Sequence, residues 1–519
     1  MKASALLIRL LAVAILLLAF GTAIHRAKVR TIAHDEALTY EWFLDQGVYH
    51  VLNFNFTNHV LQTLLAKPCV KFLGVSEFNL RIPSLIGAGI YLIATYFLCR
   101  TLFGDGSNLF LSVTMLALNP AMMGLMAAAR GYSLGLGFLA VAMYIFARLA
   151  ERGRFDRESK EWRWGCGIAS VALALSLAAN FSNIVPVICL GIAFILVTFV
   201  GPQLFLKSRD HTVHDLVRYL VLPGLAVDFC ILWPFLIQAR MAQTKTSLDN
   251  ASDSIRDVFT ASFLHKWTED VFNLGAVPSI AGSWQQRVTD LGEYAIFPLL
   301  FCFVLLGLVL ALRSSGNADK RLSPSCRIFA GTAISCVLLF IILHVALKIE
   351  YPYYRYCLYL IPLFTISGLL TSRAISFQFP SLFLKGAGLI VAAVIVLDYA
   401  ACLDSRALRY NAYDVISLDL YQAIEKDARL QDLENVRVGG TWWYEPEINF
   451  YRVSHHADWM LPYDIKDRSY WWHTPNSLVP ADYDYFVFLP QSDPGLSGGR
   501  VRNIYYDAKT HLTIIAISR

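Results

Sequence analysis

Long apolar runs recur along most of the sequence and limit what the chain can fold into more than any other feature. An α-helix needs about 20 predominantly apolar residues to cross a bilayer. The run over residues 5–24 is interpreted as a retained first span, because no small-residue cleavage site follows it. Further runs begin near Pro83, Ser107, Gly131, Gly165, Ile184, Leu216, Tyr294, Ile328, Tyr354 and Leu382. The sequence therefore predicts a polytopic α-helical membrane protein with about eleven transmembrane helices.

The composition excludes several other classes of protein. Hydrophobic residues make up 56 % of the chain and charged residues only 16 %, whereas soluble domains carry about 25 % charged residues. This excludes an ordinary cytosolic enzyme and a disordered protein. The net charge of +5 over 519 residues is too small for a nucleic-acid binder.

Charge is distributed unevenly and predicts two domains. The last 117 residues hold 28 charged residues, a soluble density. We therefore expect a transmembrane domain over 1–402 and an extracytoplasmic α/β module over 403–519. Within the module, residues 412–430 are typical of an amphipathic helix, and the segments VRVGG, YDYFVFLP and LTIIAIS are typical of strands.

The orientation follows from Lys and Arg in the short connections, which favour the cytoplasmic side. Segments 148–163 and 313–327 are rich in these residues, and Lys207 and Arg209 mark a third basic loop. With a cytoplasmic N-terminus, all three lie inside. The predicted outer segments are then 25–82, 240–292 and the C-terminal module.

The first outer loop carries an acidic sequence, AHDEALTYEWFLDQG, shortly after the first span. A helix is expected to begin at His34, Asp35 and Glu36, because acidic residues favour the first turn of a helix. Near the membrane surface the Asp35 carboxylate would be partly desolvated, which raises its pKa towards that of a general base. The alternative left open is an acid that only caps the helix.

The same loop continues with NFNFTNHVLQTLL, which places Asn58 and His59 near the start of a second helix. His34, Asn58 and His59 are candidate substrate or metal contacts, and for the histidines a metal is considered because imidazole and carboxylate groups bind divalent metals. No metal-ligand spacing supports this, so ordinary hydrogen bonding stays the alternative.

Several cations lie at the outer ends of predicted spans. Such charges are costly at this depth and are candidates for function, and guanidinium groups bind phosphate oxygens in a fork. Tyr354 is a candidate substrate contact, although tyrosines here also anchor spans at the interface. The candidate phosphate-binding cations are Arg81, Arg130, Lys348 and Arg355.

Two further features leave alternatives open. Asp228 lies within a predicted span, where a lone acid can mark an ion path and hence a transporter. The module is rich in tryptophan, including Trp442 and Trp443. Such rings suit either sugar stacking or the core of a small module.

The order of six motifs resembles that of the GT-C membrane glycosyltransferases. DEALTYEWF is followed by TNHVLQTLL, and RIPSL opens the second span. AARGYSLGLGF, YYRYCLYLIPL and WYEPEINFYR follow later in the chain. The sequence is most similar to the protein O-mannosyltransferase and aminoarabinose-transferase branch, in its bacterial RgtA/B/C/D-like form.

This resemblance implies transfer of a sugar from a polyprenyl-phosphate carrier to an acceptor on the outer face of the membrane. It implies that Asp35 is the base, that Glu36 assists it, and that displacement inverts the anomeric carbon. It implies that Arg355, Arg130 and Lys348 hold the phosphate as it leaves. Some relatives use a divalent metal and others do not. It also favours the bacterial inner membrane.

Two other functions compete with this hypothesis. A transporter or flippase of a lipid-linked saccharide predicts inverted repeats, and none is visible in the sequence. A non-catalytic subunit of polysaccharide assembly predicts that Asp35 is dispensable.

Overall fold

The structure is a computed structural model of the whole chain. It describes residues 2–45, 58–151, 159–200, 214–241, 251–252, 297–313, 324–349, 351–352, 354–375, 381–401, 403, 416–463, 483–488, 501–507 and 513–517. Most of the predicted outer loop 240–292 lies outside these residues.

The chain divides into two compact units. The first contains Met1–Ile24, His59–Gln62 and Pro83–Asp404. The second contains His25–Asn58, Thr63–Ile82 and Ser405–Arg519. Most of the first outer loop therefore forms one unit with the C-terminal region, whereas the sequence placed that loop with the transmembrane domain. The predicted domain boundary after residue 402 stays a prediction.

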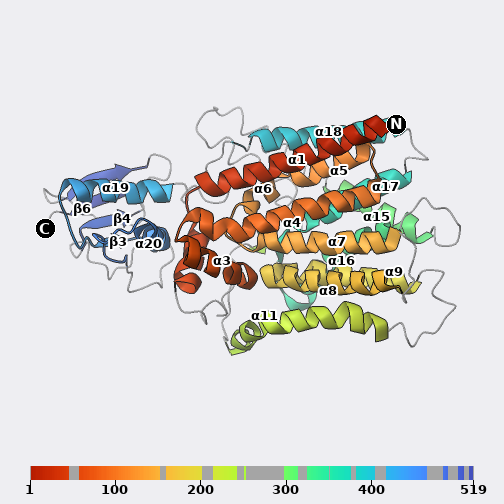
Figure 1. Ribbon diagram of the computed structural model, residues 1–519, viewed down its shortest axis with the longest axis horizontal. Helices are drawn as coiled ribbons and strands as arrows, with labels where there is room; N and C mark the ends of the chain where they lie inside the picture. Colours follow the sequence, from red (N-terminus) through yellow and green to blue (C-terminus); the bar gives the residue numbers. More distant parts are fainter. Residues whose placement is uncertain are drawn as a thin grey trace. The chain divides into compact units, whose positions relative to one another are not determined.

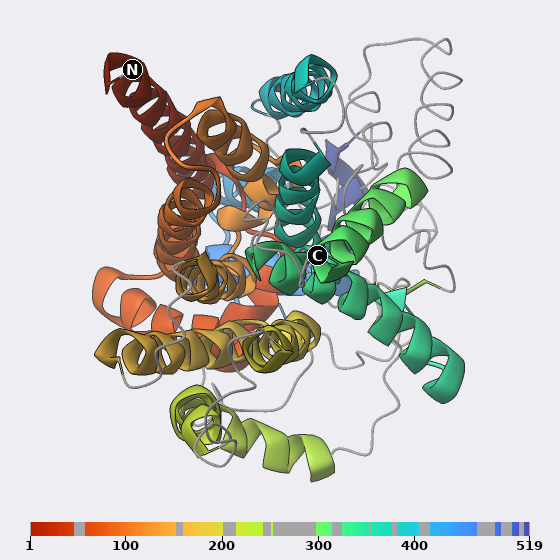
Figure 2. The same cartoon turned by 90° about the vertical axis from the view of Figure 1, so that its right-hand side faces the viewer.

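The first unit is built from long apolar helices, which lie side by side in Figure 1 and are seen from one end in Figure 2. Six helices in the described part of the chain are long and apolar enough to cross a membrane. The protein is therefore an integral membrane protein by the composition of its helices. The helices are α1 (Lys2–Val29), α4 (Glu77–Phe103), α5 (Ser107–Ala117), α6 (Pro120–Met126), α7 (Tyr132–Glu151), α8 (Lys160–Ala179), α9 (Ile184–Val200), α11 (Leu222–Met241), α15 (Phe297–Arg313), α16 (Pro324–Leu347), α17 (Leu360–Ile375) and α18 (Ser381–Ala401).

Every apolar run of the sequence contains a helix, yet the predicted number of spans is unconfirmed. Among the described residues six helices pass the length and apolarity test, and a seventh is added if α5 and α6, bent by 58°, form one broken span. The bend lies at Asn119, whose side chain accepts from Ala121 N–H and caps α6, with Pro120 at the first helical position. Other apolar helices, including Leu299–Arg313 and Leu360–Ile375, are shorter than the test requires.

Close packing of α7 depends on glycine. A Cβ atom at Gly131 would lie 1.7 Å from the carbonyl oxygen of Ala179, which ends α8. A Cβ atom at Gly137 would lie 2.7 Å from the carbonyl oxygen of Gly87 in α4. No real side chain approaches this closely, so these glycines allow α7 to pack directly on the backbones of its two neighbours.

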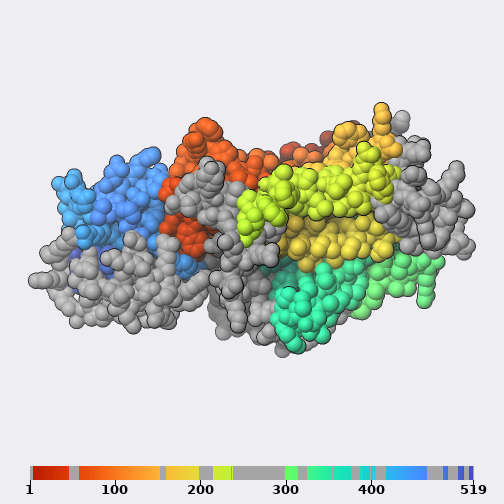
Figure 3. All heavy atoms as spheres, turned by 90° about the horizontal axis from the view of Figure 1, so that it is seen from below, coloured from red at the N-terminus to blue at the C-terminus, as the bar shows by residue number. Residues whose placement is uncertain are grey.

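Helix α11 covers α8 and presents an apolar surface. Figure 3 shows α11 as a continuous band of atoms on one face of the molecule. Leu225, Phe229 and Trp233 on α11 are about half exposed, at 56 %, 59 % and 49 %. Large exposed apolar side chains along one helix suit contact with lipid tails. Shorter elements of this unit are η3 (Phe181–Asn183), η4 (Val217–Val221), β1 (Ala251–Ser252), β2 (Tyr351–Pro352) and η7 (Tyr354–Cys357).

The second unit contains a four-stranded sheet in the order β3-β4-β6-β5, with β3 and β4 parallel and the other pairs antiparallel. All four residues of β4 are buried, which explains its uninterrupted apolar sequence. The predicted helix and the three predicted strands are present, and β5 is an addition. The elements are α19 (Ser417–Leu430), β3 (Val438–Gly440), η9 (Trp442–Tyr444), α20 (Glu445–Ser454), β4 (Tyr485–Phe488), β5 (Val501–Tyr506) and β6 (Thr513–Ile517).

The first outer loop contributes three helical segments to the same unit. They are α2 (His34–Thr39), the π-helical η1 (Tyr40–Leu44) and most of α3 (Val60–Leu73). Helix α2 packs against α20. The acidic sequence of the loop therefore forms a helix, as predicted, and this helix lies beside the C-terminal region.

Candidate functional site

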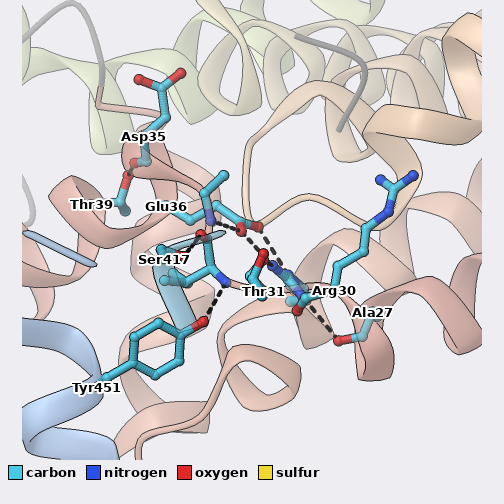
Figure 4. A network of polar contacts seen from close by, with 11 residues as sticks. Ala27, Arg30, Thr31, Asp35, Glu36, Thr39, Ser417 and Tyr451 are labelled. Atoms are coloured by element: carbon cyan, nitrogen blue, oxygen red, sulfur yellow. Dashed lines mark hydrogen bonds and ion pairs between the residues drawn. The ribbon is translucent and has the colours of Figure 1, made fainter. Parts of the chain in front are cut away.

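Asp35 occupies the second position of α2 and is half-buried. Glu36, not Asp35, closes the start of this helix: its Oε2 accepts from the Ala33 N–H at 3.0 Å, and its own N–H donates to the Ala33 carbonyl at 2.9 Å. Figure 4 shows the Asp35 carboxylate pointing away from the Glu36 carboxylate and its partners. The capping role that competed with general-base duty for Asp35 is therefore filled by Glu36.

Glu36 forms a buried ion pair with Arg81 of α4. Nε donates to Glu36 Oε1 at 3.0 Å and Nη2 donates to Oε2 at 2.6 Å, and the two side chains are 0 % and 1 % exposed. A bidentate pair of this kind has the strongest geometry available to a guanidinium group. It ties the start of α2 to α4.

Arg81 uses its remaining donors on the backbone. Nη1 donates to the carbonyl oxygens of Ala27 and Arg30 at 3.1 and 2.8 Å. Nη2 donates to the carbonyl oxygen of Thr31 at 2.7 Å. A guanidinium group has five N–H donors, and all five have acceptors within the protein. The geometry therefore favours a structural role for Arg81 over the predicted phosphate contact, and for Glu36 over the predicted assistance in catalysis.

His34, next to Asp35, is buried in contacts with the C-terminal region. Its ring stacks on the Trp443 ring, with centroids 4.3 Å apart and an interplanar angle of 7°. It also makes an edge contact with the Trp442 ring, with centroids 4.9 Å apart. His34 Nδ1 lies 2.7 Å from the Trp443 carbonyl oxygen and 3.4 Å from Glu447 Oε2. Because a carbonyl only accepts, Nδ1 carries a proton and donates it to Trp443.

Glu447 is a buried residue that the sequence analysis did not single out. It is 0 % exposed, and burial raises its pKa above the usual value, an effect that His34 partly offsets. Its position within WYEPEINFYR was the available signal, since an acid among aromatic residues is unusual in a buried helix. The buried Trp442 fits the core alternative for these rings rather than an open sugar platform.

The backbone before Asp35 is also held by the C-terminal region. Ile32 N–H donates to the Tyr451 hydroxyl at 3.0 Å, and Ser417 Oγ donates to the Ile32 carbonyl at 3.3 Å. Both contacts appear in Figure 4. Farther along the chain, the Tyr40 ring packs edge-on against the Phe450 ring, with centroids 5.4 Å apart.

Asn58 and His59 fall in different units. Asn58 Oδ1 accepts from Thr63 Oγ1 at 3.0 Å within the second unit. His59 belongs to the first unit. Its Nδ1 lies 3.1 Å from the Ala179 carbonyl oxygen, and its ring makes an edge contact with the Tyr132 ring, with centroids 5.0 Å apart. These contacts match the hydrogen-bonding alternative for His59.

The other predicted cations belong to the first unit. Arg130 is 5 % exposed, and its carbonyl accepts from Ser84 Oγ at 3.1 Å. Lys348 is exposed at the end of α16 with a left-handed backbone, φ 56°. Arg355 in η7 is half-buried, with its guanidinium 5.6 Å from the centre of the Tyr356 ring. The Tyr354 side chain lies outside the described residues.

Two solved structures of ArnT from Cupriavidus metallidurans, one in the apo state and one bound to undecaprenyl phosphate, resemble the whole chain. Both have a TM-score of 0.56 and cover 97 % of either chain, with 13 % identity for the apo form and 14 % for the complex. ArnT is a GT-C membrane glycosyltransferase. The chain has the GT-C fold.

The resemblance found in the motifs is thereby confirmed for the fold. An oligosaccharyltransferase from Archaeoglobus fulgidus, solved with zinc and sulfate, is also similar, with a TM-score of 0.48, 12 % identity and coverage of 97 % of this chain and 73 % of its own. No model of a known protein family and no curated protein sequence matches the chain.

A metal site does not emerge from the described part of this GT-C chain. No group of three His, Cys, Asp or Glu residues there is arranged to hold an ion. His34 and His59, the two predicted ligands, direct Nδ1 at the carbonyl oxygens of Trp443 and Ala179. The residues described do not fit a metal centre, so no chemical step is assigned to one.

Proposed function

We propose that this protein is an inverting glycosyltransferase that moves a sugar from a polyprenyl-phosphate carrier to an acceptor hydroxyl on the outer face of the membrane. The acceptor class is a glycan, a lipid or a protein. One observation carries the proposal: in a GT-C fold, the acid of the first outer loop has a carboxylate that points away from the buried pair beside it (Figure 4). The undecaprenyl phosphate of the ArnT complex supports a carrier of this type.

Asp35 would act as the general base. Its carboxylate takes the proton of the acceptor hydroxyl, whose oxygen then attacks the anomeric carbon. The bond between that carbon and the phosphate oxygen breaks, and its electron pair leaves on the polyprenyl phosphate. Attack opposite the leaving group inverts the anomeric centre. A positioned base of this kind contributes about 10²- to 10⁴-fold to the rate.

Arg130, Arg355 and Lys348 would stabilise the departing phosphate. Negative charge grows on its oxygens as the bond breaks, and cations that are already in place stabilise that charge most effectively. Arg355 and Arg130 can bind two oxygens at once, whereas Lys348 supplies a single point charge. Arg81 is left out of this set because its donors are satisfied by Glu36 and the backbone.

We also propose the topology. The N-terminus and the basic segments 148–163 and 313–327 face the cytoplasm, following the preference of Lys and Arg for that side. The C-terminal region then faces the periplasm, and the membrane is the bacterial inner membrane.

The test is transfer by the purified protein in detergent, with radiolabelled polyprenyl-phosphate sugars and a crude acceptor extract. Asp35→Asn removes the charge with little change in shape, and it should lower release of polyprenyl phosphate by about 10²-fold or more. Asp45→Asn, an exposed acid at the end of η1, is the matched control and should keep wild-type turnover.

Turnover by Asp35→Asn at the wild-type rate would remove Asp35 as the base. Turnover by neither protein, across a panel of donors with divalent metals present, would reject the glycosyltransferase proposal. The transporter alternative would then be examined at Asp228, which is half-buried in α11.

A further inference from the structure

The segment that carries Asp35 receives contacts from the C-terminal region on both sides of this residue. Before it, Ile32 is bonded to Tyr451 and Ser417. Directly beside it, His34 lies against Trp443, Trp442 and Glu447. All of these residues belong to one compact unit, although more than 380 positions separate the two parts in sequence.

Helix α2 has only six residues, too few for a stable isolated helix in water. Its direction must therefore come from tertiary contacts. The Glu36–Arg81 pair fixes one side of it. His34 of the same helix stacks flat on Trp443, and the Trp443 carbonyl sets the tautomer of its imidazole.

We propose that Trp443 and Glu447 are positioning residues for transfer: they hold the His34 ring and thereby aim the neighbouring Asp35 at the acceptor hydroxyl. This inference rests on the proposed function. It gives the C-terminal region a direct part in the reaction, in place of a separate binding module. Displacement of a catalytic group by about 1 Å can cost about 10²-fold in rate, so a small tilt of α2 is sufficient to matter.

Each contact can be removed separately. Trp443→Leu keeps apolar bulk and the backbone carbonyl but removes the ring that stacks on His34. Trp443→Phe keeps a ring. Glu447→Gln keeps the hydrogen-bonding shape and removes the charge. Tyr485→Phe is the matched control, because it removes a buried hydroxyl bonded to Asp427 at 2.9 Å in the same unit, away from α2.

The first readout is hydrogen exchange of the full-length protein, followed by mass spectrometry of peptides covering residues 33–40. Trp443→Leu should speed exchange there by about tenfold or more, because α2 can then open without breaking the stack between His34 and Trp443. Trp443→Phe and Tyr485→Phe should exchange as the wild type does. This measurement needs no turnover, so it tests the contact even if the proposed function fails.

The second readout separates positioning from general stability. Trp443→Leu should lower kcat by about tenfold, with KM for the lipid donor within about twofold of wild type. Glu447→Gln should lower kcat in the same direction, and Trp443→Phe should recover most of the rate. Wild-type exchange in Trp443→Leu would overturn the proposal. So would faster exchange at unchanged kcat, or the same loss of kcat in Tyr485→Phe.

Discussion

At the scale of single residues, the structure separates two neighbouring acids that the sequence presents as equals. Glu36 is buried and bonded to Arg81 and to the Ala33 N–H, whereas the Asp35 carboxylate points away from this network (Figure 4). A buried carboxylate that accepts two hydrogen bonds from a guanidinium group is held in one position. Glu36 therefore supports the helix from which Asp35 is presented.

We expect Arg81→Met to destabilise the protein by about 3–5 kcal/mol, because it leaves the Glu36 carboxylate buried without its counter-charge. Adding Glu36→Leu to that variant should restore much of the loss, since no buried charge then remains. Thermal unfolding in detergent is the measurement.

The control for this pair is Arg9→Met. Arg9 pairs with Asp105, and their side chains are 38 % and 29 % exposed, so loss of this solvent-screened pair should change stability far less than loss of the buried one. Equal losses in Arg9→Met and Arg81→Met would show that the Glu36–Arg81 pair contributes no more than a surface pair.

Glu447 predicts a pH dependence of stability. Burial raises its pKa above the usual 4.5 in the folded protein, so the folded state binds its proton more tightly than the unfolded state does. The stabilisation is then complete below pH 4.5 and is lost as pH rises from 4.5 through the raised pKa. Wild type should lose stability relative to Glu447→Gln over this interval in unfolding measurements. A constant difference between the two proteins would contradict the raised pKa.

At the scale of elements, the glycines of GYSLGLGF determine how closely helices approach. Gly131 allows α7 to meet the end of α8, and Gly137 allows it to meet α4. In the sequence this motif contributes only to a family resemblance. Its physical role follows from backbone distances between helices, which no local pattern contains.

Gly131→Ala should therefore be destabilising, since the new Cβ would lie 1.7 Å from the Ala179 carbonyl and the two helix ends would have to separate. We expect a loss of about 1–3 kcal/mol or more in thermal unfolding. Gly124→Ala in α6 is the matched control, because nothing lies within 4 Å of its Cβ position. It should be neutral or slightly stabilising.

At the scale of the whole molecule, the apolar helices form one unit, and the first outer loop joins the C-terminal region in the other. The sequence predicted the two kinds of structure, helices of spanning composition and a small α/β module. It included the loop, residues 25–82, in the transmembrane domain over 1–402, because the density of charged residues rises only after that domain. In the structure the loop has aromatic and polar partners in α19, η9 and α20.

The proposed topology predicts which residues a membrane-impermeant thiol reagent reaches in intact cells. A cysteine at exposed His456 in the C-terminal region should be labelled from outside, and one at exposed Lys160, at the start of α8, only after the membrane is permeabilised. Both cysteines should be introduced into a form of the protein whose native cysteines give little background labelling by the reagent. Labelling of Lys160→Cys in intact cells would show that the orientation is the reverse of the one proposed.

The sequence by itself determined the membrane helices and the acidic start of α2. It also determined one helix and three strands of the C-terminal region. Hydrophobic periodicity and helix-capping residues are local properties, which is why the sequence contains this information. Only the tertiary structure decided that Glu36 pairs with Arg81, that His34 meets Glu447, and that Ile32 bonds to Tyr451. These partners are 45, 413 and 419 positions apart. Contacts over such separations depend on the path of the whole chain, which periodicity and composition do not specify.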